Sequence, residues 1–388
     1  MLNMINDKAN QEEERSFLYL LYWLSKKYPV SQRLKVVKDY LMLYRARGIR
    51  FGEYHKADMY RQSAQFRSSF LGWNEARYYL DVLNPIKYYI LARNKYFAHK
   101  MLEDVGIPMA ELYCCYQPEG SISNSKDCAS DISGICRILQ DKKVVTCVIK
   151  SAESMHGENV WVVKNISYLD EDADLTLFDD SHVALSSVLQ ENQLIIESMI
   201  RQTDQFSSFN SSSVNTIRFM TTLFPNGEAK IAATWIKFGR VGKCVDNASS
   251  GGNIDGCVDV ESGEIKFPVQ FDSWNHFKEV DTHPDSGARL NGVMVKNWEA
   301  ITSEVIRYQQ SFPYCKAAGW DIAITDNGPV VVEVNDFWDV TGQFFIRHGW
   351  REEIRDCYLA WMNTGKDFAL QRQPNELSDR HLKRIVSK

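Results

Sequence analysis

One stretch limits the fold more than any other: Gly-Pro-Val-Val-Val-Glu-Val-Asn at residues 328–335. A valine-rich run bounded by a turn predicts a strand, and a buried one would have apolar side chains on its inner face. Because side chains alternate along a strand, Glu333 and Asn335 should share one face with Val331. A carboxylate and a carboxamide therefore stand side by side where apolar residues are expected.

The preceding run, Gly-Trp-Asp-Ile-Ala-Ile-Thr, predicts the partner strand of a hairpin and carries Asp321. A three-residue loop at 326–328, with Gly328 in the left-handed position of a bulge, would pair Asp321 directly with Glu333. A two-residue turn at 327–328 would pair Asp321 with Val334 on the other face. We predict the first register.

Two opposed carboxylates repel each other, and one of them would have to hold a proton. A divalent cation removes the conflict, and Mg²⁺ prefers hard oxygen ligands shared with substrate phosphates. We expect no lysine or arginine on that face to neutralise the acids. We therefore predict that Asp321, Glu333 and Asn335 bind Mg²⁺; the alternative is a polar strand that faces solvent.

The bulk composition excludes several classes of protein. The chain has 388 residues, so its length predicts two or three domains, and 44% hydrophobic residues can form a sizeable core. A net charge of −5 gives no electrostatic reason to expect binding to nucleic acid. We also see no basic amphipathic run that would indicate binding to a membrane surface. The early apolar run 17–24 is too short to span a bilayer. The nine cysteines match no zinc or disulfide pattern, which predicts reduced thiols in the cytoplasm.

The order of predicted elements indicates an α+β or mixed α/β fold rather than a regular doubly wound sheet. Residues 12 to about 105 have helical patterning, with a stop at Gly48. Short β-rich runs follow, then a long hairpin at 213–239 with its turn at 225–227. A polar, glycine-rich segment at 242–265 precedes a helix around 296–311, and the tail from about 351 is again helical.

Several segments then fit a nucleotide site. Lys150 ends a predicted strand and is followed by a loop containing Gly157, which suits a polyphosphate. The apolar run 194–202 could lay the backbone from Glu197 to Met199 along an adenine edge. The alternatives are a surface lysine and an ordinary core strand.

Two further segments suit the nucleotide and the reacting groups. Asn215 and Arg218 lie in a β run, and an inward arginine beside phosphates could stabilise charge during transfer. Asn247 is followed by two glycines that let the backbone approach a ligand. The alternatives are an arginine on an edge strand and a surface turn.

Taken in order, these features resemble the ATP-grasp superfamily, and the Asp…Glu-x-Asn spacing is similar to that of its alpha-L-glutamate ligase branch. The longer pattern SVNTIRF…VDNASSGGNIDGCVD…GWDIAITDNGPVVVEVN resembles the sugar-transfer-associated ATP-grasp group. The resemblance extends over about residues 50–340. It implies a helical N-terminal region (1–92), a subdomain with the glycine loop (93–200), a subdomain with the metal hairpin (201–350) and a helical tail (351–388).

The resemblance also implies roles for residues. Lys95 and Lys150 would contact ATP phosphates, and the backbone of Ser198 and Met199 would hold adenine. Arg218 and Asn247 would face the transferred phosphoryl group and the substrate, while Asn335 could bridge two Mg²⁺ ions.

The chain departs from the family pattern at three places. Ser151 replaces a proline after the loop lysine, and Asn159 replaces a second glycine. An arginine of the second strand of the 213–239 hairpin is missing, so Lys237 or Arg240 would have to take its place.

The implied activity is a carboxylate–amine ligase that uses ATP and Mg²⁺ and passes through an acyl phosphate. Its substrates would be a small-molecule carboxylate and an amine, which can be sugar-linked, in polysaccharide biosynthesis. One alternative is a kinase of a sugar or polyol hydroxyl; another is a non-catalytic nucleotide-binding subunit of a polysaccharide assembly system. No nucleic-acid partner and no membrane span are expected.

Overall fold

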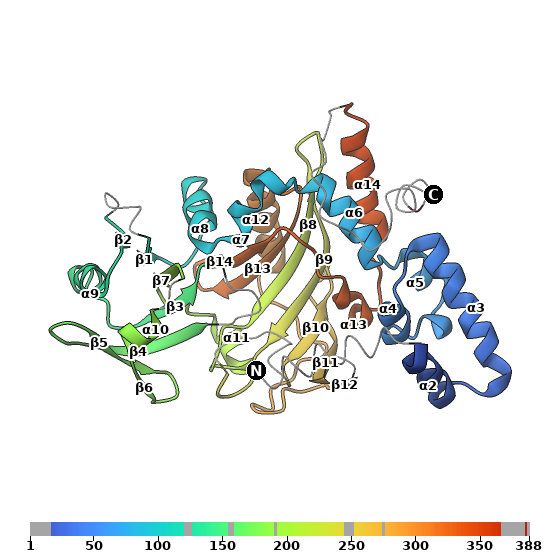
Figure 1. The fold of residues 1–388 in the computed structure, drawn as a ribbon, viewed down its shortest axis with the longest axis horizontal. Coiled ribbons are helices and arrows are strands. Elements are labelled where there is room, and N and C mark those ends of the chain that lie inside the picture. The colour runs from blue at the N-terminus through green and yellow to red at the C-terminus, as the bar shows by residue number, and fades with distance from the viewer. Residues whose placement is uncertain are drawn as a thin grey trace.

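The computed structural model describes residues 17–119, 126–153, 159–189, 192–243, 252–273, 276–365 and 385. It confirms the α+β fold: two seven-stranded sheets are joined to a helical N-terminal region (Figure 1). The α12 helix (Trp298–Ser311), the stop of α3 at Gly48 and the 225–227 turn are confirmed. Among the helices of these ranges, none has the length and apolar content needed to cross a bilayer.

The first sheet has the strand order β2-β1-β7-β3-β4-β5-β6. Apart from the parallel pair β1–β2, its neighbours are antiparallel, and α9 covers a core of aliphatic side chains. Its elements are β1 (Leu112–Tyr116), β2 (Cys128–Ala129), α9 (Ile132–Asp141), β3 (Cys147–Ser151), β4 (Val160–Tyr168), β5 (Ala173–Leu177), β6 (His182–Ala184), α10 (Leu185–Val188) and β7 (Leu194–Glu197).

The second sheet has the order β12-β11-β10-β9-β8-β13-β14 and is antiparallel throughout. After α11 (Asp204–Phe209), its strands are β8 (Thr216–Leu223), β9 (Ala229–Phe238), β10 (Ile254–Val258), β11 (Ile265–Ser273), β12 (His276–Glu279), β13 (Ala317–Thr325) and β14 (Gly328–Asn335). The expectation of one polar segment at 242–265 was therefore incomplete, because β10 forms inside it and pairs with β9.

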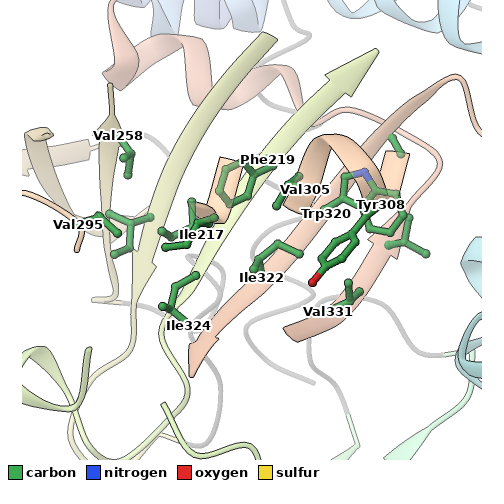
Figure 2. Close-up of a cluster of buried hydrophobic side chains, with 14 of the residues drawn as sticks. Ile217, Phe219, Val258, Val295, Val305, Tyr308, Trp320, Ile322, Ile324 and Val331 are labelled. Atoms are coloured by element: carbon green, nitrogen blue, oxygen red, sulfur yellow. The ribbon is translucent and has the colours of Figure 1, made fainter. Parts of the chain in front are cut away.

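One face of the second sheet packs on α12. Figure 2 shows the side chains of this layer: Ile217 and Phe219 from β8, Trp320 and Ile322 from β13, and Val305 and Tyr308 from α12. Phe219 stacks on Trp298 with ring centroids 5.5 Å apart. Burying each such side chain contributes about 1.5–3 kcal/mol, so this layer holds the sheet rigid under the residues on its opposite face.

The hairpin β13–β14 has the predicted pairing of Asp321 with Glu333, but it reaches it differently. Thr325 pairs with Gly328 across a two-residue loop, and the extra residue lies farther along β14, where the register shifts. This bulge restarts the alternation. Val331 is therefore buried against α12 with Val334, and our prediction that it shares a face with Glu333 was wrong.

The helical N-terminal region has its own core at one end of the molecule (Figure 1). Its elements are α2 (Phe17–Lys27), α3 (Val30–Arg47), α4 (Phe51–Lys56), η1 (Met59–Arg61) and α5 (Ala64–Ser69). The chain continues through α6 (Trp73–Leu83), η2 (Ile86–Tyr88), α7 (Ile90–Arg93) and α8 (Lys95–Asp104) to the first sheet.

The segment after β14 connects the second sheet with the N-terminal region through η4 (Val340–Gly342), α13 (Gln343–Ile346) and α14 (Arg351–Met362). Phe344 stacks on Phe70 with centroids 5.9 Å apart. A Cβ atom at Gly349 would lie 2.3 Å from the backbone of Ser69, so only glycine permits this close approach.

Candidate active site

A row of functional side chains crosses the second sheet on the face opposite α12. Cross-strand pairing joins Trp235 of β9 to Arg218 of β8, Arg218 to Asp321 of β13, and Asp321 to Glu333 of β14. Directly paired residues project to the same side of a sheet. The row therefore puts a ring, a guanidinium and two carboxylates next to one another.

Asp321 is the centre of this row and holds two cations. Arg218 donates from Nε and Nη2 to its two oxygens at 2.5 and 2.7 Å, and Lys237 Nζ lies 2.9 Å from Oδ1. Burial alone would raise the pKa of Asp321, but Arg218 and Lys237 lower it to about 2. Burial would likewise lower the pKa of Arg218, yet Asp321 keeps it above its ordinary value. Asp321 and Arg218 are therefore both charged at neutral pH.

This cluster corrects one premise of the sequence argument. We expected no lysine or arginine on the face of Asp321, but two arrive from β8 and β9. Asp321 thus needs no metal to offset its charge.

Glu333 and Asn335 are better placed than Asp321 to bind a metal ion. The Glu333 carboxylate is 33% exposed and lies 3.9 Å from Lys95 Nζ, beyond hydrogen-bond distance. Asn335 donates its amide N–H to the carbonyl of Gly319 at 3.3 Å, which leaves the amide oxygen as an acceptor. Within the described ranges no three His, Cys, Asp or Glu side chains gather around one point. The donor set that fits Mg²⁺ is therefore Glu333 and Asn335 with oxygens from a ligand.

The first sheet brings a second charged pair to the same place. Lys150 of β3 lies 2.5 Å from Glu197 of β7, and both side chains are buried. Burial lowers the pKa of Lys95, nearby Lys150 lowers it further, and Glu333 and Glu197 act against this. Two ammonium groups that repel each other between two sheets form a place for an anion.

Comparison with known proteins agrees with this geometry. The family model for the sugar-transfer-associated ATP-grasp domain matches residues 74–356. The chain belongs to this family. The match starts in α6 and ends in α14, so it includes both sheets and leaves α2–α5 outside.

Solved ATP-grasp enzymes resemble the chain only distantly. A biotin carboxylase from Campylobacter jejuni has 10% identity and a TM-score of 0.42, over 74% of this chain and 52% of that one. This chain thus spans about half of that enzyme. A D-alanine–D-alanine ligase from Bacillus anthracis has 13% identity and a TM-score of 0.38, over 71% of this chain and 70% of that one. None of the curated proteins matches the chain.

Two other predicted site residues, Asn215 and Arg240, have partners outside the group formed by Asp321, Arg218 and Lys237. Asn215 is buried. Its amide N–H groups donate to Gln202, Phe206 and Asn210, and its amide oxygen accepts from the N–H of Gly239. These bonds hold the segment between α11 and β8 in place. Arg240 is held by Asp285 at 2.7 Å; of the two candidate cations, Lys237 is the one that reaches Asp321.

On the adenine side, the N–H of Ser198 donates to the carbonyl of Glu111 at 2.8 Å. Ser198 and Met199 follow directly after the last residue of β7, Glu197. Gly157 and Asn247 lie outside the described residues.

A pocket opens beside the row, at its β9–β10 end. It is lined by aromatic rings, among them Trp235, Phe271 and Phe345, and by the charged side chains Lys56, Asp255 and Asp339. Trp235 has the Arg218 guanidinium 5.7 Å from its ring centre, and Asp255 pairs across the strands with Lys237. The empty space within its lining, about 630 Å³, includes open solvent at its mouth.

Sequence reasoning missed three of these lining residues. Asp339 follows the valine strand in the sequence Asp-Phe-Trp-Asp, and its charge contributes to the raised pKa of Arg218. Trp235 lies in β9, two residues before Lys237, whereas Asp255 lies in β10, a strand that the sequence analysis did not predict. The spacing of two between Trp235 and Lys237, in a predicted strand, was the one available signal.

Proposed function

We propose that the protein is an ATP- and Mg²⁺-dependent carboxylate–amine ligase. The observation that carries this proposal is the cross-strand row Arg218–Asp321–Glu333, which faces the two ammonium groups of Lys95 and Lys150. An ATP-dependent ligase needs both parts: cations for the phosphates and a second set of cations where the phosphoryl group is transferred.

On the nucleotide side, Lys95 and Lys150 bind the phosphate oxygens, and the Ser198–Met199 backbone receives adenine. Glu333 and Asn335 hold Mg²⁺, with Asp321 completing the set when the phosphates compete for Arg218 and Lys237. When bound, Mg²⁺ offsets charge on the phosphates and orients them.

On the acceptor side, a carboxylate oxygen of the substrate attacks the γ-phosphorus, and the bond to the ADP oxygen breaks. Arg218 and Lys237 bind the transferring phosphoryl group. Both side chains already contact an anion, the carboxylate of Asp321. The amine then attacks the acyl carbon, phosphate leaves, and the amine loses a proton. Before the phosphates bind, Asp321 holds both cations in position.

The pocket beside Trp235 receives the acceptor. Rings suit the apolar face of a sugar, and Asp255 and Asp339 suit hydroxyl or ammonium groups. With the sugar-transfer association of the family, this favours a sugar acid joined to an amino acid or amine in polysaccharide biosynthesis. The eight described cysteines are free thiols, which agrees with a cytoplasmic enzyme.

Hydroxylamine trapping tests this proposal. The protein is incubated with Mg·ATP, hydroxylamine and a panel of uronic acids and amino acids, and products are read by mass spectrometry. A ligase gives a hydroxamate, ADP and free phosphate in equal amounts.

Two other outcomes would contradict the proposal of a ligase. A phosphorylated sugar or polyol with no hydroxamate identifies a kinase. ATP binding with no ADP from any substrate supports a non-catalytic subunit. The matched variants are Glu333→Gln, which should abolish ADP formation, and Glu264→Gln, a surface change that should not.

A further inference from the structure

The N-terminal helices carry a charge opposite to that of the whole protein. Between residues 17 and 56 the sequence has nine lysines and arginines and two acids, Asp39 and Glu53, whereas the chain has a net charge of −5. Both acids are engaged within the protein. Asp39 binds Arg67 at 2.6 Å, and Glu53 is buried and accepts from the backbone of Trp73 at 2.6 Å.

The outward face of α3 is both apolar and basic. Residues at helical spacing on one side are exposed: Val30, Leu34, Lys35, Lys38, Leu41, Met42 and Arg45, together with Ser31. Leu34 is 79% exposed and Leu41 55% exposed. These residues recur every three or four positions and so form one stripe along 18 residues. The stripe contains no acid.

The inward face of α3 is already satisfied. Val36 is 1% exposed, and Val37, Tyr40 and Leu43 pack on the same N-terminal core. The helix therefore does not need its outer leucines for folding. Figure 1 places α3 along the outer edge of the molecule, away from the two sheets.

We propose that this stripe docks on an anionic phospholipid surface, with α3 lying in the plane of the headgroups. Leu34, Leu41 and Met42 would enter the boundary of the acyl chains while Lys35, Lys38 and Arg45 meet lipid phosphates. A helix with large apolar residues, cations and no acids on one face has the chemistry that such a surface selects. A second protein with a neutral apolar groove would offer no anion to Lys35 and Lys38.

This docking revises an expectation from the sequence, where no basic amphipathic run was evident. The 30–47 segment has apolar residues on both sides of the helix, so its pattern does not show which side the protein covers. The fold buries one side and leaves the stripe outside. The inference is independent of the proposed ligase chemistry, although Lys56, at the end of α4 in the same region, lines the acceptor pocket.

Vesicle co-sedimentation of the full chain tests the proposal. Vesicles of phosphatidylglycerol mixed with phosphatidylcholine are compared with vesicles of phosphatidylcholine alone. We expect binding to the first, weakening as the screening length falls from about 10 Å at 0.1 M salt to about 3 Å at 1 M. Each near-surface cation is worth about fivefold in binding, so Lys35→Glu with Lys38→Glu should weaken it at least about 25-fold.

Two control variants separate the stripe from general effects. Lys126→Glu with Lys296→Glu makes the same change in net charge on exposed lysines of other regions and should leave binding within a few-fold. Leu34→Asp with Leu41→Asp should abolish binding. Val145→Asp with Leu169→Asp, at residues of 56% and 59% exposure, should not. Circular dichroism confirms that each variant is folded.

Three results would overturn the proposal. One is the absence of sedimentation with anionic vesicles, and another is equal loss in the stripe variants and their controls. The third is a dimer, seen by light scattering, that Leu34→Asp with Leu41→Asp dissociates while vesicles do not bind; the stripe would then join two copies of the chain.

Discussion

Replacing Asp321 by asparagine removes the shared anion of the cluster without changing its volume. Arg218 and Lys237 have side chains only 12% and 8% exposed, so neither cation can turn to water. Breaking a buried ion pair by removing one partner costs about 3–5 kcal/mol, because an uncompensated charge stays behind. We expect Asp321→Asn to lower the free energy of unfolding by an amount in this range.

The titration of Asp321 gives a second value for the same contribution. Its pKa in the folded protein is about 2, below the ordinary value of 3.8. A fall of this size corresponds to roughly 2–3 kcal/mol. Because the folded pKa lies below the unfolded one, this stability is present above about pH 4 and is lost as the pH falls toward 2.

Urea unfolding followed by tryptophan fluorescence measures both effects. At pH 7 the free energy of unfolding of the wild type should exceed that of Asp321→Asn by about 2–5 kcal/mol, and the difference should shrink toward zero between pH 4 and 2. Adding Lys237→Met to the variant should recover part of the loss, since one uncompensated cation is gone. Glu304→Gln is the control: it breaks an exposed pair with Arg307 and should cost less than about 1 kcal/mol.

Either of two results would contradict the prediction for Asp321→Asn. A loss in Asp321→Asn no larger than in Glu304→Gln would mean that Asp321 does not hold the two cations. A difference that stays constant from pH 7 to pH 2 would mean that its carboxylate does not carry the effect.

Three further predictions concern turnover and nucleotide binding. Glu333→Gln should abolish ADP formation yet leave the urea midpoint almost unchanged, because the carboxylate is partly exposed and makes only a loose contact with a lysine. Lys237→Met should lower kcat by about 10²–10³, as for loss of one stabilising donor, whereas Arg240→Met should lower it less than about threefold when ADP release is assayed. Lys150→Met should weaken ATP binding in calorimetry and also destabilise the fold by about 3–5 kcal/mol, because Glu197 stays buried without its partner; Lys150→Arg should restore the stability but not the full affinity.

Local sequence patterns predicted the parts of the fold that depend on near neighbours. The pairing of Asp321 with Glu333 was predicted and is confirmed, although a two-residue loop and a bulge in β14 produce it in place of the predicted three-residue loop. The position of the bulge was not predictable, since the run of valines gives either side of β14 an apolar residue. As a result, the side of the sheet on which Val331 lies was predicted incorrectly.

Long-range pairing explains what the sequence did not show. Arg218 lies 103 residues before Asp321, and only the order β9-β8-β13-β14 brings both cations to that carboxylate. Within the hairpin alone the acids lacked partners, which made a metal the simplest answer for all three residues. Across the sheet, Asp321 has partners, and the metal proposal now depends mainly on Glu333 and Asn335.

The central claim is that a divalent ion and nucleotide phosphates meet at Glu333 and Asn335, opposite Lys95. Crystals grown with Mn²⁺ and ADP, measured for anomalous scattering from manganese, test it directly. We predict an anomalous peak about 2.0–2.3 Å from a Glu333 carboxylate oxygen and from the Asn335 amide oxygen, with β-phosphate oxygens completing its coordination. ADP bound with the manganese peak elsewhere, or with no peak between these two side chains, would contradict the claim.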